Sequence, residues 1–297
     1  MSDRNDVLVF GATGNMGGAA ARELLRRGWQ VRAVTRNPQS EKAQALAARG
    51  AELVQADMDD RASLEAAFDG MTRVFSVENC HMRGADGEIR QGKLVADAAR
   101  AAGVRHLVYG SAGAGEPNSG IPHFDCKLVV EDYMRSLDLP FTIVRPTPFM
   151  ELMSEKEYYP AMAAWGAMPK AVGWDTPLPW VAVHDIGVAV ANIFADPAAW
   201  IGRDITLCGD LRSLSQSRVA FQTVAGKKPR GIPLPLALFQ RMAGEELVQM
   251  WRWLDRDIAT RGQDQYMTLL DATREVCPQP HDVAGWLRLA HNGRNGA

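Results

Sequence analysis

The stretch Gly11-Ala12-Thr13-Gly14-Asn15-Met16-Gly17-Gly18 decides the fold of this chain. It follows the apolar run Val7-Leu8-Val9-Phe10 and opens a helical pattern that extends to Arg27. Glycines at every third position between a strand and a helix are typical of a loop that holds a diphosphate. The first glycine permits the tight turn, the second lets the backbone approach the phosphates, and the third lets the helix pack on the strand. The first amides and the dipole of the helix then favour the negative charge.

The first half of the chain alternates short apolar runs with longer helical stretches. We expect strands at 7–10, 30–35, 53–56, 74–77, 106–111 and 141–145, and helices at 14–27, 40–49, 63–68, 91–102 and 124–137. Such alternation predicts a parallel sheet with helices on both faces, and continuous apolar strands fit because parallel strands are buried on both sides. The sequence therefore predicts an α/β fold with a doubly wound parallel-sheet Rossmann domain.

After Arg145 the pattern changes to a loop-rich stretch with frequent prolines. We expect a helix at 183–195, a strand at 205–207, and helices at 215–225 and 236–254. Asp185 is interpreted as a cap of the helix start or as a catalytic group. The predicted organisation is a Rossmann domain over residues 1–150 and a smaller mixed α+β C-terminal lobe over residues 151–297, with the chain crossing between lobes around 180–210.

Arg36 at the end of the second expected strand points to the type of dinucleotide. An NAD site usually has an acidic residue there to meet the ribose hydroxyl, whereas Val34-Thr35-Arg36-Asn37-Pro38 has none. A guanidinium matches the 2′-phosphate of NADP, so we expect NADP(H) to be preferred over NAD(H). The alternative is that Arg36 is a solvated loop residue. Asp57, after the third strand, either meets the adenine edge or caps the next helix.

Composition excludes several classes of protein. The net charge of −2 and the scattered basic residues argue against direct nucleic-acid binding. No apolar run is long enough for a membrane span, and the N-terminus lacks a signal-peptide pattern, so we expect a cytoplasmic location. The four cysteines form no Cys-x-x-Cys pair and no zinc-like spacing, so no metal is expected. Cys126 is noted because it lies in the segment with the candidate catalytic residues.

Five motifs together resemble the NmrA-like family, a branch of the atypical short-chain dehydrogenases/reductases. They are the glycine stretch, the Arg36 segment, Gln55-Ala56-Asp57, Gln91-Gly92-Lys93, and Pro122-His-Phe-Asp-Cys-Lys-Leu-Val-Val-Glu131. The likeness runs from about residue 5 to 155. It implies a Rossmann core with NADP(H) bound in a cleft beside a smaller lobe. By position it also implies that Lys127 reaches the nicotinamide ribose and that Lys93 lies near the cofactor.

One departure from the wider superfamily concerns proton donation. The usual Tyr-x-x-x-Lys reads His123-Phe-Asp-Cys-Lys127 here, so the tyrosine is absent. His123 either supplies the proton, because its ordinary pKa lies near neutrality, or is a helix-start residue without chemistry. Ser111 at the end of the fifth strand either faces the substrate or is a polar strand-end residue. Phe149, after the sixth strand, can pack against a nicotinamide.

These observations define the predicted site and function. The candidate catalytic residues are Lys127, His123 and Ser111, and the candidate cofactor-binding residues are Gly11, Thr13, Gly14, Asn15, Met16, Gly17, Arg36, Asp57, Lys93, Lys127 and Phe149. We predict an NADPH-dependent reductase that transfers hydride to a small apolar carbonyl, quinone or conjugated acceptor. The alternative is a non-catalytic NADPH/NADP redox sensor that regulates through a protein partner. A homodimer is possible in either case.

Overall fold

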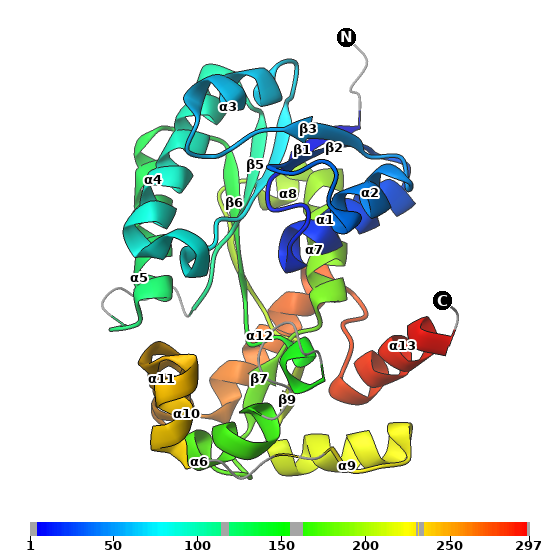
Figure 1. Ribbon diagram of the computed structural model, residues 1–297, viewed down its shortest axis with the longest axis vertical. Coiled ribbons are helices and arrows are strands. Elements are labelled where there is room, and N and C mark those ends of the chain that lie inside the picture. The colour runs from blue at the N-terminus through cyan, green and yellow to red at the C-terminus, as the bar shows by residue number, and fades with distance from the viewer. Residues whose placement is uncertain (1–4, 114–118, 155–162, 230, 232–234, 296–297) are drawn as a thin grey trace. The chain divides into compact units, whose positions relative to one another are not determined.

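The computed structural model describes residues 5–113, 119–154, 163–229, 231 and 235–295. The chain divides into two compact units (Figure 1). The first contains Met1–Arg145 and Ile186–Ile205, and the second contains Pro146–Asp185 and Thr206–Ala297. The chain thus leaves the first unit after its sixth strand and returns to it for one further helical segment.

A seven-stranded sheet forms the centre of the first unit. Its strand order is β3-β2-β1-β4-β5-β6-β8, and the registered neighbours from β3 to β6 are all parallel. The strands are β1 (Asp6–Val9), β2 (Gln30–Thr35), β3 (Glu52–Gln55), β4 (Arg73–Ser76), β5 (His106–Gly110), β6 (Phe141–Pro146) and β8 (Asp204–Leu207). The six expected strands of the first half are confirmed to within one residue at each end, as is the doubly wound α/β fold class.

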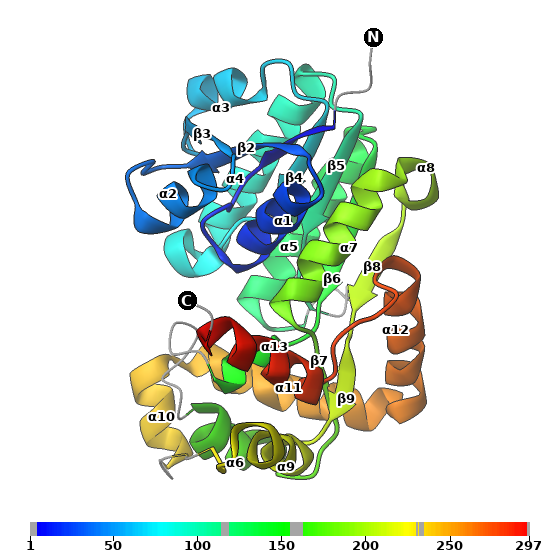
Figure 2. The same ribbon diagram turned by 90° about the vertical axis from the view of Figure 1, so that its right-hand side faces the viewer.

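Helices cover both faces of this sheet because the strand order reverses at β1. The helices α1 (Asn15–Arg26) and α2 (Glu41–Ala47) lie on one face, and α3 (Arg61–Phe68), α4 (Cys80–Ala101) and α5 (Pro122–Ser136) lie on the other (Figures 1 and 2). Right-handed crossovers produce this division, since β1 to β3 extend one way and β4 to β6 the other. The point of reversal, between β1 and β4, is where open α/β sheets bind ligands.

Residues 186–195 of α7 (Val183–Ala195) complete the face that carries α1 (Figure 2). A Cβ atom on Gly187 would lie 2.5 Å from the carbonyl oxygen of Ala19, so the two helices touch through their backbones. The Arg27 guanidinium also donates to the Asn192 side chain over 2.6 Å. The short helix α8 (Pro197–Trp200) then leads into β8.

Each of the two units contains an apolar cluster of buried side chains. In the first unit, buried side chains of β1, β4 and β5 pack with those of α3, α4 and α5, with Phe10, Phe68 and Tyr109 almost fully buried. In the second unit, the cluster gathers around the indole rings of Trp165, Trp180, Trp251 and Trp286. Each unit therefore has a hydrophobic core of its own.

The second unit combines a small sheet with helices, which confirms the mixed α+β lobe. The strands β7 (Leu178–Trp180) and β9 (Asp210–Arg212) pair antiparallel. The helices are η1 (Met150–Met153), η2 (Ala163–Ala167), α6 (Met168–Val172), α9 (Leu214–Ala225), α10 (Leu236–Ala243), α11 (Glu245–Arg261), α12 (Gln263–Val276) and α13 (Val283–Asn295). Within the described part of the chain, no helix is long and apolar enough to span a bilayer.

Three sequence-based expectations need correction. The helix expected at 91–102 begins at Cys80, where the glycines of its first half had hidden the helical pattern, and it contains a break at Gly84 (φ 72°, ψ 173°). The single helix expected at 236–254 is two, because Gly244 has φ 91°. Asp185 does not cap α7: the Val183 N–H donates to Glu151, and Asp185 accepts from His281 instead.

Candidate functional site

The glycine loop joins β1 to α1 through a turn that needs its glycines. Gly11 has φ 63°, and a Cβ atom there would lie 2.8 Å from the Val77 side chain. The Gly14 N–H donates to the Gly11 carbonyl over 2.8 Å and closes the turn. A Cβ atom on Gly17 would overlap the Gly11 carbonyl and lie 2.6 Å from that of Phe10. Helix α1 therefore approaches the end of β1 as closely as its backbone allows.

The amino end of α1 is open to an anion. Gly14 is the N-cap, no described side chain caps it, and the first turn contains no acidic residue. Within the described residues, its first amides and the positive end of its dipole thus have no side-chain cap. Thr13 is half-buried and Asn15 exposed, whereas the Met16 side chain is buried toward the end of β5. Among the predicted loop residues, Met16 therefore offers a ligand only its backbone.

The Val77 side chain, directly after β4, packs against the loop that precedes α1 and against the end of β5. The uncapped start of α1 therefore lies at the point where the strand order reverses. A Cβ atom on Gly110, at the end of β5, would lie 3.0 Å from the Val77 Cβ, and Val77 also meets Gly11. The carboxyl ends of β1, β4 and β5 therefore meet around one side chain. Gly11 and Gly110 both pack against Val77, so the three strand ends approach one another closely.

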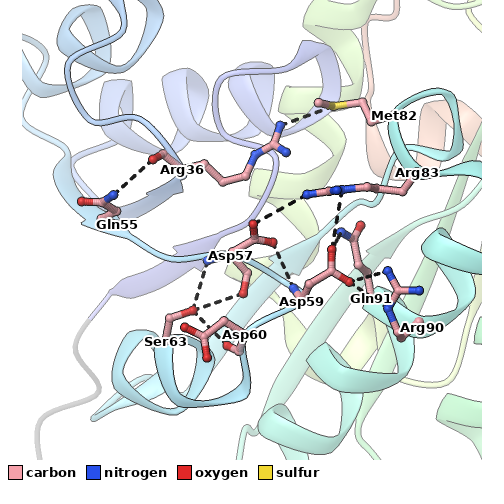
Figure 3. A network of polar contacts seen from close by, with 10 residues as sticks. All are labelled: Arg36, Gln55, Asp57, Asp59, Asp60, Ser63, Met82, Arg83, Arg90 and Gln91. Atoms are coloured by element: carbon pink, nitrogen blue, oxygen red, sulfur yellow. Dashed lines mark hydrogen bonds and ion pairs between the residues drawn. The ribbon is translucent and has the colours of Figure 1, made fainter.

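Arg36 and Asp57 follow β2 and β3 at the same edge of the sheet (Figure 3). The Arg36 side chain is exposed, and its Nη2 lies 3.6 Å from Met82 Sδ. Asp57 Oδ1 accepts from the Asp59 N–H over 3.0 Å. Helix α3 is capped by Asp60, whose carboxylate accepts from the Ala62 N–H over 3.1 Å. The capping role considered for Asp57 thus belongs to Asp60, which leaves the Asp57 carboxylate beside the Arg36 loop.

Lys127 lies buried on α5, with its ammonium at the carboxyl ends of β4 and β5. Nζ is 2.6 Å from Glu88 Oε1, 3.2 Å from the Gly110 carbonyl oxygen and 3.4 Å from that of Glu78. The two carbonyl contacts are hydrogen bonds, and the contact with Glu88 is an ion pair. Burial acts to lower the pKa of Lys127, but the carboxylates of Glu88 and Glu78 outweigh it and raise that pKa. In this arrangement the ammonium is directed at protein groups.

The buried cluster around Lys127 contains two carboxyl groups, those of Glu88 and Glu78, and one ammonium. Glu78 Oε1 accepts from the Ser76 hydroxyl over 2.5 Å, and Glu78 Oε2 has no hydrogen-bond partner among the described residues. Burial raises the pKa of Glu78. Burial and these carboxylates also raise the pKa of the fully buried Tyr109. A phenol in that position keeps its proton at neutral pH.

His123 and Ser111, the other candidate catalytic residues, differ in where their polar atoms lie. His123 is half-buried in the first turn of α5, one turn before Lys127, and its ring meets Phe124 edge-on with centroids 4.5 Å apart. The buried Ser111 hydroxyl donates to Glu131 Oε1 over 2.5 Å. Glu131 is in turn paired with Arg145. The hydroxyl of Ser111 is therefore engaged inside the protein, and His123 is the more accessible group.

The last two predicted cofactor residues and Cys126 pack inside the protein. Lys93 Nζ is 5.1 Å from the centre of the Tyr133 ring, at the contact between α4 and α5. Phe149 belongs to the second unit, where it forms a β-bridge with Val181 and packs on that unit's core. Burial raises the pKa of Cys126 to about 12, so its thiol is unreactive at neutral pH.

One group of metal-type side chains occurs among the described residues. His184, Asp185 and His281 of the second unit hold their ligand atoms within 4.8 Å of one another. Asp185 Oδ1 lies 2.6 Å from His281 Nδ1 and 3.2 Å from His184 Nδ1, and Asp185 Oδ2 accepts from the His281 N–H. These hydrogen bonds account for the grouping, since they tie the segment before α13 to the start of α7.

A model of the NmrA-like family matches residues 3–287. The chain belongs to the NmrA-like family. Among its curated relatives are two NmrA-like family domain-containing oxidoreductases. One, lnaB of Aspergillus flavus, is 32% identical over 255 residues, which cover 78% of this chain and 76% of that protein. The other, himF of Aspergillus japonicus, is 32% identical over 267 residues, covering 83% and 81%.

Solved structures confirm the NmrA-like fold over the whole chain. NmrA, a negative transcriptional regulator solved in complex with NADP, has a TM-score of 0.74 at 23% identity and covers 100% of this chain and 99% of its own. The triphenylmethane reductase of Citrobacter sp., complexed with NADP(H), has a TM-score of 0.75 at 22% identity and covers 96% and 99%. At such identity the likeness establishes the fold.

Sequence reasoning missed three residues at this NmrA-like site: Glu78, Glu88 and Arg83. Glu78 directly follows the apolar run 74–77, and a charged residue at the buried end of a parallel strand is a signal that was present. Glu88 and Arg83 lie in the half of α4 whose glycines had hidden the helix. Without that helix, neither could be placed near Lys127 or Arg36.

Proposed function

We propose that this protein is an NADP(H)-dependent oxidoreductase that reduces a small apolar carbonyl, quinone or conjugated acceptor. The observation that carries the proposal is the open amino end of α1 at the strand reversal. Its glycines leave no side chain where a diphosphate would lie, and its uncapped amides suit that anion. A Cβ atom at Gly11 or Gly17 would meet protein atoms, so the turn itself needs these glycines, and the uncapped helix start that it presents fits a diphosphate.

The family comparisons support the redox class. The curated relatives that cover about three quarters of this chain are named oxidoreductases. Structures with this fold include complexes of NmrA with NADP and with NAD and a complex of the NADPH-dependent quinone oxidoreductase of Escherichia coli with NADPH. The preference for NADP(H) is supported by Arg36, whose guanidinium stands where an acidic residue would serve NAD.

Residues of the first unit have different roles in such a reaction. A bound nicotinamide supplies or accepts the hydride. The glycine loop fixes the diphosphate, and Arg36 binds the adenosine end. Lys127 donates to the carbonyl of Glu78 after β4 and to that of Gly110 at the end of β5, which keeps the nicotinamide side of the site rigid. The proton that accompanies the hydride comes from His123 or from water, because Ser111 is bonded to Glu131 and Tyr109 is buried.

Turnover measurements test this function. Purified protein is mixed with NADPH and a panel of quinones, aldehydes, imines and conjugated ketones, and the loss of nicotinamide absorbance is followed. We expect saturable turnover with at least one acceptor, and Arg36→Gln should raise the KM for NADPH while leaving kcat nearly unchanged. Binding of NADPH with no turnover on the whole panel would contradict the reductase and favour the regulatory alternative. Failure to bind NADPH at all would refute the cofactor site.

A further inference from the structure

A second guanidinium, that of Arg83, lies beside Arg36 at the adenosine end of the site. Arg83 ends the short turn that opens α4, immediately before the break at Gly84, whose φ of 72° redirects the chain. The preceding residue, Met82, contacts Arg36 through its sulfur at 3.6 Å. Figure 3 shows the Arg83 side chain lying between Arg36 and Asp57. Two segments far apart in sequence therefore bring two cations to one place.

The carboxylates nearest to Arg83 are not hydrogen-bonded to it. Asp59 accepts from Arg90 at 2.9 and 2.7 Å and from Gln91 at 2.8 Å. Arg83 Nε, by contrast, is 3.6 Å from Asp59, and Arg83 Nη2 is 3.9 Å from Asp57. Both distances are longer than the donor–acceptor distance of a hydrogen bond. The Asp59 carboxylate is thus occupied by Arg90 and Gln91, and it steers Arg83 without taking up its donors.

The Arg36 guanidinium makes even weaker contacts with protein groups than that of Arg83. Its guanidinium contacts a thioether sulfur, which is a weak acceptor, and no ion pair joins it to a carboxylate within the described residues. The network holds three guanidiniums, those of Arg36, Arg83 and Arg90, and three carboxylates, those of Asp57, Asp59 and Asp60 (Figure 3). The Asp60 carboxylate is turned to the start of α3, and that of Asp59 accepts from Arg90 and Gln91, so these two leave donors of Arg36 and Arg83 to a ligand.

We infer that Arg83 is a second ligand of the adenosine 2′-phosphate and, with Arg36, sets the preference for NADP(H) over NAD(H). This inference rests on the proposed function. A phosphate monoester has close to two negative charges at neutral pH and three acceptor oxygens, enough for two forked guanidiniums. Without it, the guanidinium donors that the neighbouring carboxylates do not take up have only solvent to bind. NAD(H), which lacks that phosphate, gains nothing from Arg83.

Calorimetry with NADP⁺ and NAD⁺ on Arg83→Gln and on wild type tests the inference. Because charge-assisted hydrogen bonds are lost, Arg83→Gln should weaken NADP⁺ binding about 10-fold or more, with NAD⁺ changed less than about 2-fold. Arg83→Lys keeps the charge without the fork and should give an intermediate loss. Arg61→Gln is the matched control, since Arg61 is 73% exposed on α3 and paired with Glu65, and it should change neither affinity.

A fragment experiment identifies the phosphate that is recognised. Adenosine 2′-monophosphate should bind wild type more tightly than adenosine 5′-monophosphate or inorganic phosphate, and Arg83→Gln should reduce the difference, because Arg36 remains. Equal losses for NADP⁺ and NAD⁺, an unchanged NADP⁺ affinity, or inorganic phosphate binding as tightly as the 2′-nucleotide would each overturn the inference while leaving the dinucleotide site in place. If wild type bound neither NADP⁺ nor NAD⁺, the proposed function itself would fail.

Discussion

Replacing Lys127 with methionine tests whether its ammonium serves the protein interior or reaches outward to a ligand. Lys127 is 9% exposed and Glu88 is 0% exposed, and their charged atoms are 2.6 Å apart. Methionine fills most of the space but leaves Glu88 and Glu78 buried without a cation. Removing one partner of a buried ion pair costs about 3–5 kcal/mol, so we expect Lys127→Met to lower the free energy of unfolding by that amount.

Urea unfolding followed by circular dichroism measures this loss, and the pH dependence adds a signature. In the variant the two carboxyl groups can relieve their repulsion only by protonation, so the loss should be larger at mildly alkaline than at mildly acidic pH. Lys93→Met is the control: it removes a lysine on the neighbouring helix that packs on Tyr133, and it should cost less than about 1 kcal/mol.

The double variant Lys127→Met, Glu88→Gln separates the ion pair from general damage. Removing both charges should cost less than the sum of the two single changes, with a coupling of about 0.5–3 kcal/mol between them. A Lys127→Met protein as stable as wild type that nevertheless binds NADP⁺ poorly would refute this reasoning. It would mean that the ammonium points into the ligand site, as the family resemblance implies, and that Glu88 is not its partner.

Three further predictions concern other residues. Gly17→Ala should weaken NADP⁺ binding and destabilise the protein by about 1–3 kcal/mol, measured by calorimetry and urea unfolding, because its Cβ would overlap backbone. His281→Gln should lower the free energy of unfolding most between pH about 4 and 6.5. Asp185 raises the pKa of His281, so the stabilisation from their pairing is lost as the pH rises through that raised pKa. The same stabilisation is lost in acid, when Asp185, whose pKa is lowered, gains a proton. Cys126 should resist alkylation by iodoacetamide at neutral pH until the protein is unfolded in urea, since burial raises its pKa to about 12. Peptide mapping separates it from the less buried Cys80, and rapid labelling of Cys126 itself in native protein would contradict this.

The fold was predictable from sequence wherever one signal dominated. The buried parallel strands were visible as continuous apolar runs, and Gln30–Thr35 was placed at its observed bounds. The start of α4 was not, because Gly84 and Gly87 lower helix propensity in a segment whose helicity depends on packing against α3 and α5. The division at Gly244 was missed for the opposite reason: apolar residues on both sides suggested one continuous helix.

The candidate site was predictable where geometry follows from local sequence. The turn at Gly11 and the close packing of Gly17 need only the strand–loop–helix order. The partners of Lys127 and Ser111 depend on which helix lies against which strand, and hydrogen bonds to Glu88 and Glu131 cannot be read from spacing along the chain. Whether Lys127 and His123 act on a cofactor and substrate stays a prediction.

The return of the chain to its first unit has a consequence for how the protein is made. Residues 186–205 supply the helix that touches α1 through backbone and the first half of β8, the strand that flanks β6. A ribosome that has released only the first 145 residues has therefore produced a sheet with one face partly bare and one edge unpaired. About sixty more residues must be synthesised before this unit can close. Expression of a fragment that ends near residue 150 should yield aggregates, whereas joining 1–147 to 186–207, which keeps β6 and β8 whole, through a short linker should not.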